Sequence, residues 1–496
     1  MSVIGGRGSI NDELINGCDV KAMITGMPER KPSIADSAYG SSEDLLSTSL
    51  DYLASDLSAE PENDVIACPG WSSLDEEEGL FDFEAEAVPT EEDAVRQIPL
   101  LKDTKELIEF WKYPCEHHIV ETRDGFMLGL YRIPNPQHGP TAFSAIPPYE
   151  RPPVIIWHGL YIQSAAFVSS PAGPTGNLAF VLADAGFDVW LANSRGTVSS
   201  RRHRHWQSPE EAMFHSQYWK YVGLDEMAKF DVPAVVNYVC ETTGWNKVAY
   251  LGYSQGTAQM FMSLSVSEEM NEKVAIFVGL APALKPKPIS NETINALTRR
   301  FTPSVLYGLG IWSFLPPAEW LRPMLPSDMY AQIVHNALII LTGWSCDKWK
   351  RSWWPALYMH LFGGGSVRNV VHWFRIITEQ TFTPYEHEIA PHHLRLISPT
   401  QEEQQRTTTA IQTFAPKRTG PCSYPTHHIK TRVDLFCGAE DTISDPDVFK
   451  TALPKASIKI IDNYQHMDFL WDPAAKEAVW NDVISAIRET MDLVNV

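Results

Sequence analysis

Short apolar runs alternate with helical segments over much of the chain, and this alternation constrains the fold more than any other feature. The runs contain few polar residues, which is typical of strands buried on both faces of a parallel sheet. The runs that we interpret as such strands are residues 153–157, 188–192, 247–252 and 274–280. The helical segments are residues 178–185, 225–239 and 257–265. Strands that alternate with helices predict an α/β fold with a mostly parallel central sheet.

A hairpin precedes this alternation, and a long interruption divides it. Residues 117–122 and 126–133 have the composition of strands, and Asp124-Gly125 between them accepts the positive φ of a tight turn. The alternation stops after Pro282, and strands return at 432–437 and 458–461, before a C-terminal helix at 474–493. The predicted parts are core residues 98–282 and 429–496, a helical cap inserted between sheet strands over 283–428, and a mobile loop at 399–419.

Residues 1–97 are rich in Ser, Gly, Asp and Glu and contain only scattered apolar residues. Between residues 51 and 96, fifteen acidic residues accompany one arginine, so this stretch holds about two-thirds of the net charge of −21. Such a segment buries too little apolar surface to offset its conformational entropy, so we predict an acidic, largely disordered tail. The negative charge also argues against nucleic acid as a partner.

Residues 252–256 read Gly-Tyr-Ser-Gln-Gly, between a predicted buried strand and a helix of small residues. In this context the pattern indicates a nucleophile on a sharp strand-to-helix turn, where the glycines let neighbouring chains pass closely. Without that context the same pattern occurs in ordinary turns. Ser254 is therefore the candidate nucleophile of a serine hydrolase.

A serine hydroxyl is a weak nucleophile and requires a base that a carboxylate orients. His466 follows the strand 458–461 and Asp441 follows the strand 432–437, just as Ser254 follows its own strand. Parallel strands bring their carboxyl ends to one edge of the sheet. We therefore expect the three side chains to meet there, in the chain order Ser, Asp, His.

Other residues compete for the acid and base roles. Glu440, Asp445 and Asp447 lie in the same loop as Asp441, although Asp445 has the alternative role of capping the next helix. His427 and His428 precede a strand, which places them at the opposite edge of the sheet.

Ester hydrolysis passes through an oxyanion, which requires backbone N–H donors. One donor is expected from Gln255, the residue after the nucleophile, and the other from the loop after the strand 153–157. That loop reads His158-Gly159-Leu160, which makes Leu160 the predicted second donor and gives His158 a supporting role.

The remaining features limit the other classes of site. Seven widely spaced cysteines without a Cys-x-x-Cys pair argue against a disulfide framework or a zinc site, although one pair, Cys346 with Cys422, stays open. We predict no cofactor and no metal. There is no apolar run of about 18 residues and no pattern of a secretory signal, so we expect a cytoplasmic protein without a transmembrane helix.

Two features each allow two interpretations. Residues 201–205, Arg-Arg-His-Arg-His, are expected in a solvated loop, with a contact to phospholipid as the alternative. Residues 283–428 hold seven of the sixteen tryptophans. These are either core residues or the lining of an apolar tunnel or interfacial face, which a lipid substrate requires.

Several motifs together resemble the acid-lipase family, which includes gastric and lysosomal acid lipases and fungal steryl ester hydrolases. The resemblance extends from about residue 113 to residue 487. Its motifs are Tyr113-Pro114-Cys115-Glu116-His117, Thr122-Arg123-Asp124-Gly125-Phe126, His158-Gly159-Leu160, Asn193-Ser194-Arg195-Gly196, Asp225-Glu226-Met227 and His466-Met467-Asp468-Phe469-Leu470-Trp471. In the family's acid loop the first Asp of Asp-x-x-x-Asp-Pro is catalytic, which assigns that role to Asp441.

Two stretches are most similar to the fungal steryl ester hydrolases: Gly256-Thr257-Ala258-Gln259 with 280–283, and Ser366-Val367 with 370–374. Tyr253 departs from the His of animal members. The resemblance implies an α/β-hydrolase fold with a cap. It also implies hydrolysis of steryl esters or triacylglycerols through an acyl-enzyme, and a peripheral location at lipid droplets or membranes. The alternatives are an acyltransferase with the same triad and a non-catalytic lipid-binding protein.

Overall fold

The computed structural model describes residues 88–134, 150–205, 216–288, 312–313, 324–361, 363–385 and 423–494. Residues 1–87 of the predicted tail and the predicted loop at 399–419 lie outside this part. The proposed division of the chain into core, cap and tail stays a prediction.

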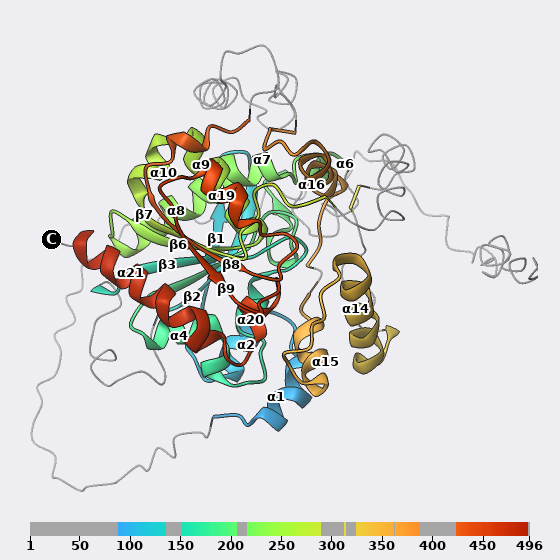
Figure 1. Ribbon diagram of the computed structural model, residues 1–496. Helices are drawn as coiled ribbons and strands as arrows, with labels where there is room; N and C mark the ends of the chain where they lie inside the picture. Colours follow the sequence, from blue (N-terminus) through green and yellow to red (C-terminus); the bar gives the residue numbers. More distant parts are fainter. Residues whose placement is uncertain are drawn as a thin grey trace, which may run out of the picture. The chain divides into compact units, whose positions relative to one another are not determined.

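Within the described residues, nine strands form one sheet in the order β1-β2-β4-β3-β6-β7-β8-β9, with β5 paired to β2 (Figure 1). The neighbours from β4 to β9 are parallel, whereas β2 pairs antiparallel with β1, β4 and β5. The mostly parallel sheet is confirmed. The strands are β1 (Glu116–Glu121), β2 (Phe126–Ile133), β3 (Pro153–Trp157), β4 (Asp188–Ala192), β5 (Arg202–His203), β6 (Val248–Tyr253), β7 (Val274–Leu280), β8 (Arg432–Gly438) and β9 (Ser457–Ile461).

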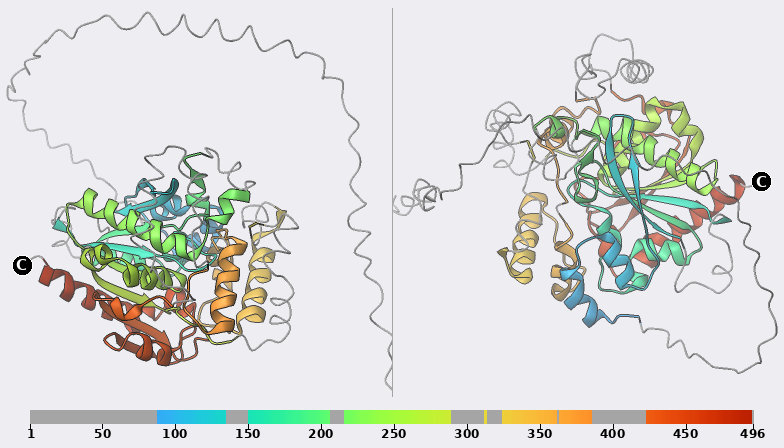
Figure 2. Two further views of the ribbon diagram at one scale, coloured as in Figure 1. Left: turned by 90° about the horizontal axis from the view of Figure 1, so that it is seen from above. Right: turned by 180° about the vertical axis from the view of Figure 1, so that it is seen from behind.

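The sheet has a hydrophobic core on each face. Successive side chains of a strand point to opposite faces, so Val154 and Ile156 of β3 belong to one core and Ile155 and Trp157 to the other. Helices lie on both faces of the sheet (Figure 2). Those over the first core are α4 (Leu178–Asp184) and α21 (Asn481–Val494), and those over the second are α8 (Val232–Thr243), α9 (Gln255–Val266) and α10 (Glu268–Lys273).

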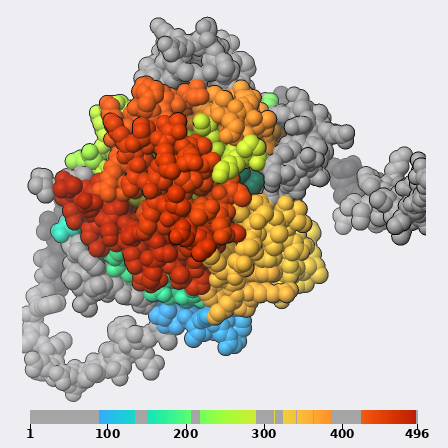
Figure 3. Space-filling model, viewed as in Figure 1, coloured from blue at the N-terminus to red at the C-terminus, as the bar shows by residue number. Residues whose placement is uncertain are grey.

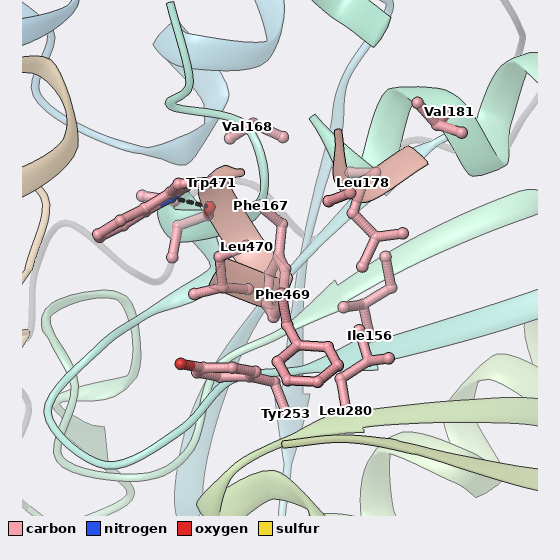
Figure 4. Packing of buried hydrophobic residues seen from close by; sticks show 14 of the residues in the cluster. Ile156, Phe167, Val168, Leu178, Val181, Tyr253, Leu280, Phe469, Leu470 and Trp471 are labelled. Atoms are coloured by element: carbon pink, nitrogen blue, oxygen red, sulfur yellow. Dashed lines mark hydrogen bonds between the residues drawn. The ribbon is translucent and has the colours of Figure 1, made fainter. Parts of the chain in front are cut away.

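Part of the first core lies beside the end of β6 (Figure 4). Ile156, Tyr253 and Leu280 from three neighbouring strands gather there with Phe469 and Trp471 from the C-terminal part of the chain. Full burial of side chains of this size contributes about 1.5–3 kcal/mol each. These packed side chains therefore fix the position of the end of β6.

The predicted helix at 225–239 is helical throughout but not a regular α-helix. It consists of α7 (Leu224–Glu226), a π-helical turn η7 (Met227–Asp231) and α8. Pro233 in the first turn of α8 has no N–H, so the regular α-helical ladder is interrupted at this point.

The described parts of the segment between β7 and β8 consist of helices and loops, with one isolated bridge between Ser313 and Ser366. They contain α14 (Ser327–Thr342), η9 (Arg351–Trp353), α15 (Trp354–Tyr358) and α16 (Val367–Glu379). None of the helices in the described ranges combines the length and the apolarity needed to cross a bilayer. The remaining short helices are η2 (Ile98–Leu100), α2 (Thr104–Phe110), η4 (Ser164–Phe167), η5 (Pro174–Gly176), η6 (Val198–Ser200), α6 (Ser216–Lys220), η10 (Thr426–His428), α19 (Pro446–Ala452), α20 (Asp468–Trp471) and η11 (Lys476–Trp480).

The prediction that the acidic tail extends to residue 97 is wrong at its end, because α1 (Glu91–Gln97) is a helix. Thr90 and Asp93 form a capping box, and Ala94 is fully buried. Glu91 accepts hydrogen bonds from Lys350 Nζ at 2.7 Å and Trp353 Nε1 at 2.8 Å. These partners lie far along the chain, so local composition gives no sign of them.

The basic run at 201–205 is solvated only in part, since Arg202, Arg204 and His205 are exposed but the run is not wholly a loop. Arg202 and His203 form β5, and the side chains of Arg201 and His203 are buried. His203 Nε2 lies 3.1 Å from the carbonyl oxygen of Asp124, and Arg204 pairs with Glu121. Pairing with β2 thus overrides the polar composition of the run.

Candidate active site

Ser254, Asp441 and His466 lie together at the carboxyl edge of the parallel strands. They follow β6, β8 and β9, whose ends are kept level by the register of the sheet through β7. The order along the chain and the edge are those expected from the sequence. All three side chains are buried.

A continuous hydrogen-bond chain joins the three residues. Ser254 Oγ lies 2.7 Å from His466 Nε2, and His466 Nδ1 lies 2.8 Å from Asp441 Oδ2. A carboxylate can only accept, so Nδ1 carries the donated proton and Nε2 is left to accept from the serine hydroxyl. Asp441 Oδ1 accepts the N–H of Ile443 at 2.8 Å, which fixes the carboxylate plane. The arrangement is able to remove a proton from Ser254.

The backbone at Ser254 is strained, with φ +52° and ψ −118°. Such a conformation costs about 1–3 kcal/mol, which the surroundings must offset. Ser254 N–H donates to the carbonyl of Leu280 at 3.1 Å, and its own carbonyl accepts the Thr257 hydroxyl at 2.6 Å. A Cβ on Gly256 would lie 2.5 Å from the carbonyl oxygen of Trp157, so only glycine permits this close approach.

The other carboxylates of the acid loop have different partners. Asp445 caps α19 by accepting the N–H of Asp447 at 3.1 Å. Asp447 is paired with Lys450, and Glu440 lies 3.5 Å from Gln465 Nε2. Among the carboxylates that the structure describes, Asp441 is the one hydrogen-bonded to His466. His427 and His428 lie in η10, before β8 begins.

The two predicted oxyanion donors lie near the nucleophile. Gln255 is the first residue of α9. Leu160 follows Gly159, where an added Cβ would lie 2.9 Å from Ser254 Cβ. Within the described part of the chain, neither the Gln255 N–H nor the Leu160 N–H donates a hydrogen bond. Both are therefore available to a substrate oxygen.

His158 supports the loop that carries Leu160. Its Nδ1 donates to the carbonyl of Gly159 at 2.8 Å, and its Nε2 accepts the N–H of Ser194 at 3.0 Å. Burial lowers the pKa of His158 to about 4, so the ring is neutral and keeps this tautomer near pH 7. The supporting role expected for this residue agrees with its contacts.

Trp344 contacts the site although the sequence pattern gives no specific signal for it. Its ring stacks on the imidazole of His466, with centroids 4.8 Å apart and planes at 17°. Its Nε1 donates to Thr442 Oγ1 at 3.2 Å, and the neighbouring Ser345 N–H donates to Gln465 Oε1 at 2.7 Å. The segment after α14 therefore packs directly on the loop that carries the base.

Tyr253, the departure from the animal lipases, also holds this loop. Its hydroxyl donates to the carbonyl of His466 at 3.1 Å, and its ring centroid lies 5.2 Å from the imidazole. Tyr253 thus contacts the base without interrupting the hydrogen-bond chain.

Comparisons with known proteins match this fold and this site region. A family profile described as a partial alpha/beta-hydrolase lipase region covers residues 104–171, and one described as alpha/beta hydrolase fold covers residues 152–309. Gastric triacylglycerol lipase of Rattus norvegicus is 31% identical over 398 residues, which are 77% of this chain and 91% of that protein. A protein of Schizosaccharomyces pombe named a probable lipase is 33% identical over 385 residues, 77% of this chain and 79% of that one. The chain belongs to the acid lipase family of α/β-hydrolases.

The motif Asn193-Ser194-Arg195-Gly196 has a structural role beneath the site. The fully buried Arg195 pairs with Asp124 Oδ2 at 2.6 Å and with Asp231 Oδ1 at 2.7 Å. These charges raise the pKa of its guanidinium despite complete burial. The neighbouring Ser194 accepts the indole N–H of Trp157 at 2.7 Å. The motif therefore ties the hairpin turn to the strand ends beneath the site.

The described residues offer neither a metal site nor a reactive thiol as an alternative to Ser254. In the described ranges no three His, Cys, Asp or Glu side chains are placed to hold a metal ion. Cys115, Cys240, Cys346 and Cys437 are free thiols, and burial raises the pKa of Cys346 to about 12. A thiol with so high a pKa stays protonated and is a poor nucleophile.

Proposed function

We propose that this acid lipase hydrolyses lipid esters, namely steryl esters and triacylglycerols, with Ser254 as nucleophile, His466 as general base and Asp441 as the orienting acid. The observation that carries the proposal is the hydrogen-bond chain from Ser254 Oγ through the imidazole to Asp441. Three features suit acyl transfer: the strained backbone at Ser254, the acceptor nitrogen of His466 that faces it, and the free N–H groups of Gln255 and Leu160.

The reaction proceeds in two halves. Ser254 Oγ attacks the ester carbonyl while His466 Nε2 takes its proton, and Asp441 stabilises the imidazolium. The carbonyl oxygen becomes an oxyanion that accepts from the N–H groups of Gln255 and Leu160. Collapse expels the alcohol, which receives the proton from His466, and leaves an acyl-enzyme. Water, deprotonated by His466, then attacks the acyl carbon and releases the fatty acid and the serine.

The substrate class rests on the relatives and on the aromatic cap. The rat relative is named for triacylglycerol, and the resemblance to fungal steryl ester hydrolases extends it to sterols. Trp344 stacks on the imidazole of His466 and Trp373 donates to Gln255, so aromatic side chains of the cap lie against the site.

We propose a peripheral location at a lipid droplet or membrane surface. The support is one face of α14, where Met329, Ile333 and Ile340 are 52%, 53% and 66% exposed, with Met324 before the helix 75% exposed. Residues four and seven apart share a helix face, so Met329, Ile333 and Ile340 lie on one face of α14 and form an apolar strip that the exposed Asn336 interrupts. Figure 3 shows α14, in yellow, on the molecular surface.

A substrate panel with Ser254→Ala tests the proposal. The wild type should release fatty acid from cholesteryl ester or triacylglycerol. The variant should lose at least about 10⁴-fold in kcat while keeping its Tm. Retained hydrolysis in a folded Ser254→Ala would refute the assignment. Product analysis with added sterol separates the acyltransferase alternative, which would form steryl ester in place of free acid.

A further inference from the structure

The side chain of Gln255 is held by the cap helix α16. It is only 3% exposed, and its Oε1 accepts two hydrogen bonds, from Asn369 Nδ2 at 2.9 Å and from Trp373 Nε1 at 2.8 Å. At the other end, Gln255 Nε2 lies 3.7 Å from Met227 Sδ. A buried amide with partners at both ends has little freedom to move. The residue next to the nucleophile is thus attached to a helix more than a hundred positions later.

Helix α16 is itself fixed to the core where it meets Gln255. Ser366 caps the helix by accepting the N–H of Asn369 at 2.9 Å, and its hydroxyl donates to the carbonyl of Val222. Arg368 pairs with Glu226 at 2.8 Å inside the protein. A Cβ on Gly223 would lie 2.3 Å from Glu226 Oε2, so a larger residue would displace this buried pair.

A second buried carboxylate, that of Asp225, contacts two residues that are far apart in the sequence, Tyr385 and Tyr424. Asp225 accepts the hydroxyl of Tyr424 at 2.7 Å and the N–H of Tyr385 at 2.8 Å. His372 of α16 lies with Nε2 2.8 Å from the carbonyl of Thr383. The buried charges of Asp225, Glu226 and Arg368 favour this placement of α16 against the core, because another placement would leave a buried charge without its partner.

These contacts bear on catalysis because they end at a proposed oxyanion donor. Gln255 N–H sits one residue after a backbone with φ +52°, which would relax if its neighbours allowed it. An oxyanion hole requires its donors within a few tenths of an ångström of the developing charge. Fixing the Gln255 side chain restrains the backbone that carries this N–H.

We propose that Asn369 and Trp373 are positioning residues that hold the oxyanion hole in its active geometry through the side chain of Gln255. The inference rests on the proposed function of Ser254 and adds to it a direct link from the cap to the transition state. The motif of Ser366-Val367 with 370–374 and the Asp225-Glu226-Met227 motif then serve one structure, the attachment of α16 to the nucleophile turn.

The test compares two tryptophan variants of the full-length protein. Trp373→Phe keeps an aromatic ring but removes the N–H that Gln255 accepts. Trp353→Phe is the matched control, because its Nε1 donates to Glu91 at 2.8 Å in another part of the cap. The measurements are kcat and KM on a soluble short-chain p-nitrophenyl ester, the rate of phosphonylation by a fluorophosphonate, and Tm.

We expect Trp373→Phe to lower kcat and the phosphonylation rate about tenfold, a part of the 10²–10³-fold that loss of a whole donor costs. KM should stay within twofold, and Trp353→Phe should leave kcat, KM and the phosphonylation rate near wild type. An unchanged kcat, or a raised KM alone, would show that Trp373 only packs the cap. Asn369→Leu, which removes the other donor at similar volume, gives the same readout if Trp373→Phe does not fold. Activity that survives Ser254→Ala would overturn the proposed function instead, so the two failures are distinct.

Discussion

At the scale of single residues, hydrogen bonding distinguishes the acid of the site from its neighbours. Four carboxylates lie within one loop, and their spacing alone leaves several candidates. In the structure Asp441 reaches His466 Nδ1, whereas Asp445 caps the following helix. The two side chains are chemically identical and differ only in their hydrogen-bond partners, which are the imidazole of His466 for Asp441 and the N–H of Asp447 for Asp445.

Replacing each of these two carboxylates by its amide separates their roles. Asp441→Asn should lower kcat by about 10³–10⁴-fold, because an amide can present a donor to Nδ1 and favours the wrong imidazole tautomer. Asp445→Asn should leave kcat within about twofold, since Asn is an equally good N-cap. Steady-state rates on a p-nitrophenyl ester measure both. Equal losses in the two variants would contradict the assignment of the acid.

The positions of Ser254, Asp441 and His466 are predictable because each follows a strand that an apolar run reveals. The contacts of Trp344 with His466 and of Trp373 with Gln255 are not, since they join segments with no local pattern in common. Tryptophan in the cap indicates only a large apolar side chain. Which catalytic group it meets is a property of the tertiary structure.

At the scale of elements, the inner strands β3, β4, β6 and β7 follow from sequence almost to the residue, because burial on both faces leaves a continuous apolar run. The exceptions have a common cause. Strand β5 lies in a basic run, and α1 ends an acidic segment. Both are ordered by partners distant in sequence, β2 for one and Lys350 with Trp353 for the other. Composition predicts such elements poorly because their stability is not local.

The apolar strip of α14 predicts a contact with lipid. Ile333→Asp should reduce the fraction of protein that floats with phosphatidylcholine liposomes or lipid droplets about tenfold, since it replaces a buried apolar contact by a charge. Leu493→Asp is the matched control, because Leu493 is 73% exposed on α21. Equal flotation of the two variants, with Tm unchanged, would exclude α14 as the lipid-binding face.

At the scale of the whole molecule, buried acids and buried histidines oppose one another in the dependence of stability on pH. Burial raises the pKa of Asp231 and of Asp468 from 3.8 to about 6. The folded state then keeps protons that the unfolded state loses, so stability falls as pH rises through this window. Burial lowers the pKa of His158 and of His203 from 6.5 to about 4, so their contribution falls as pH drops. The two effects offset each other between about pH 4 and 6.

Asp468→Asn and His203→Gln should therefore change the pH profile of Tm in opposite directions. Asp468 lies 3.3 Å from Lys348, which lowers the pKa of its carboxyl, and near Asp472, which raises it. The effect of burial is the largest, so the pKa is raised. Relative to wild type, Tm of Asp468→Asn should improve from pH 4 to pH 7, and Tm of His203→Gln should improve from pH 7 to pH 4. Thermal melts at both pH values measure this. Parallel profiles for both variants would contradict the account.

The central claim, that Ser254 is the nucleophile of an ester hydrolase, is tested most directly by covalent labelling. The wild type is treated with a fluorophosphonate probe, residual hydrolysis of a lipid ester is followed during labelling, and the modified peptide is identified by mass spectrometry. We predict one label, on Ser254, with activity lost in proportion to labelling and no label on folded Ser254→Ala. A label on another residue that accounts for the lost activity, or full hydrolysis by protein labelled completely at Ser254, would contradict the claim.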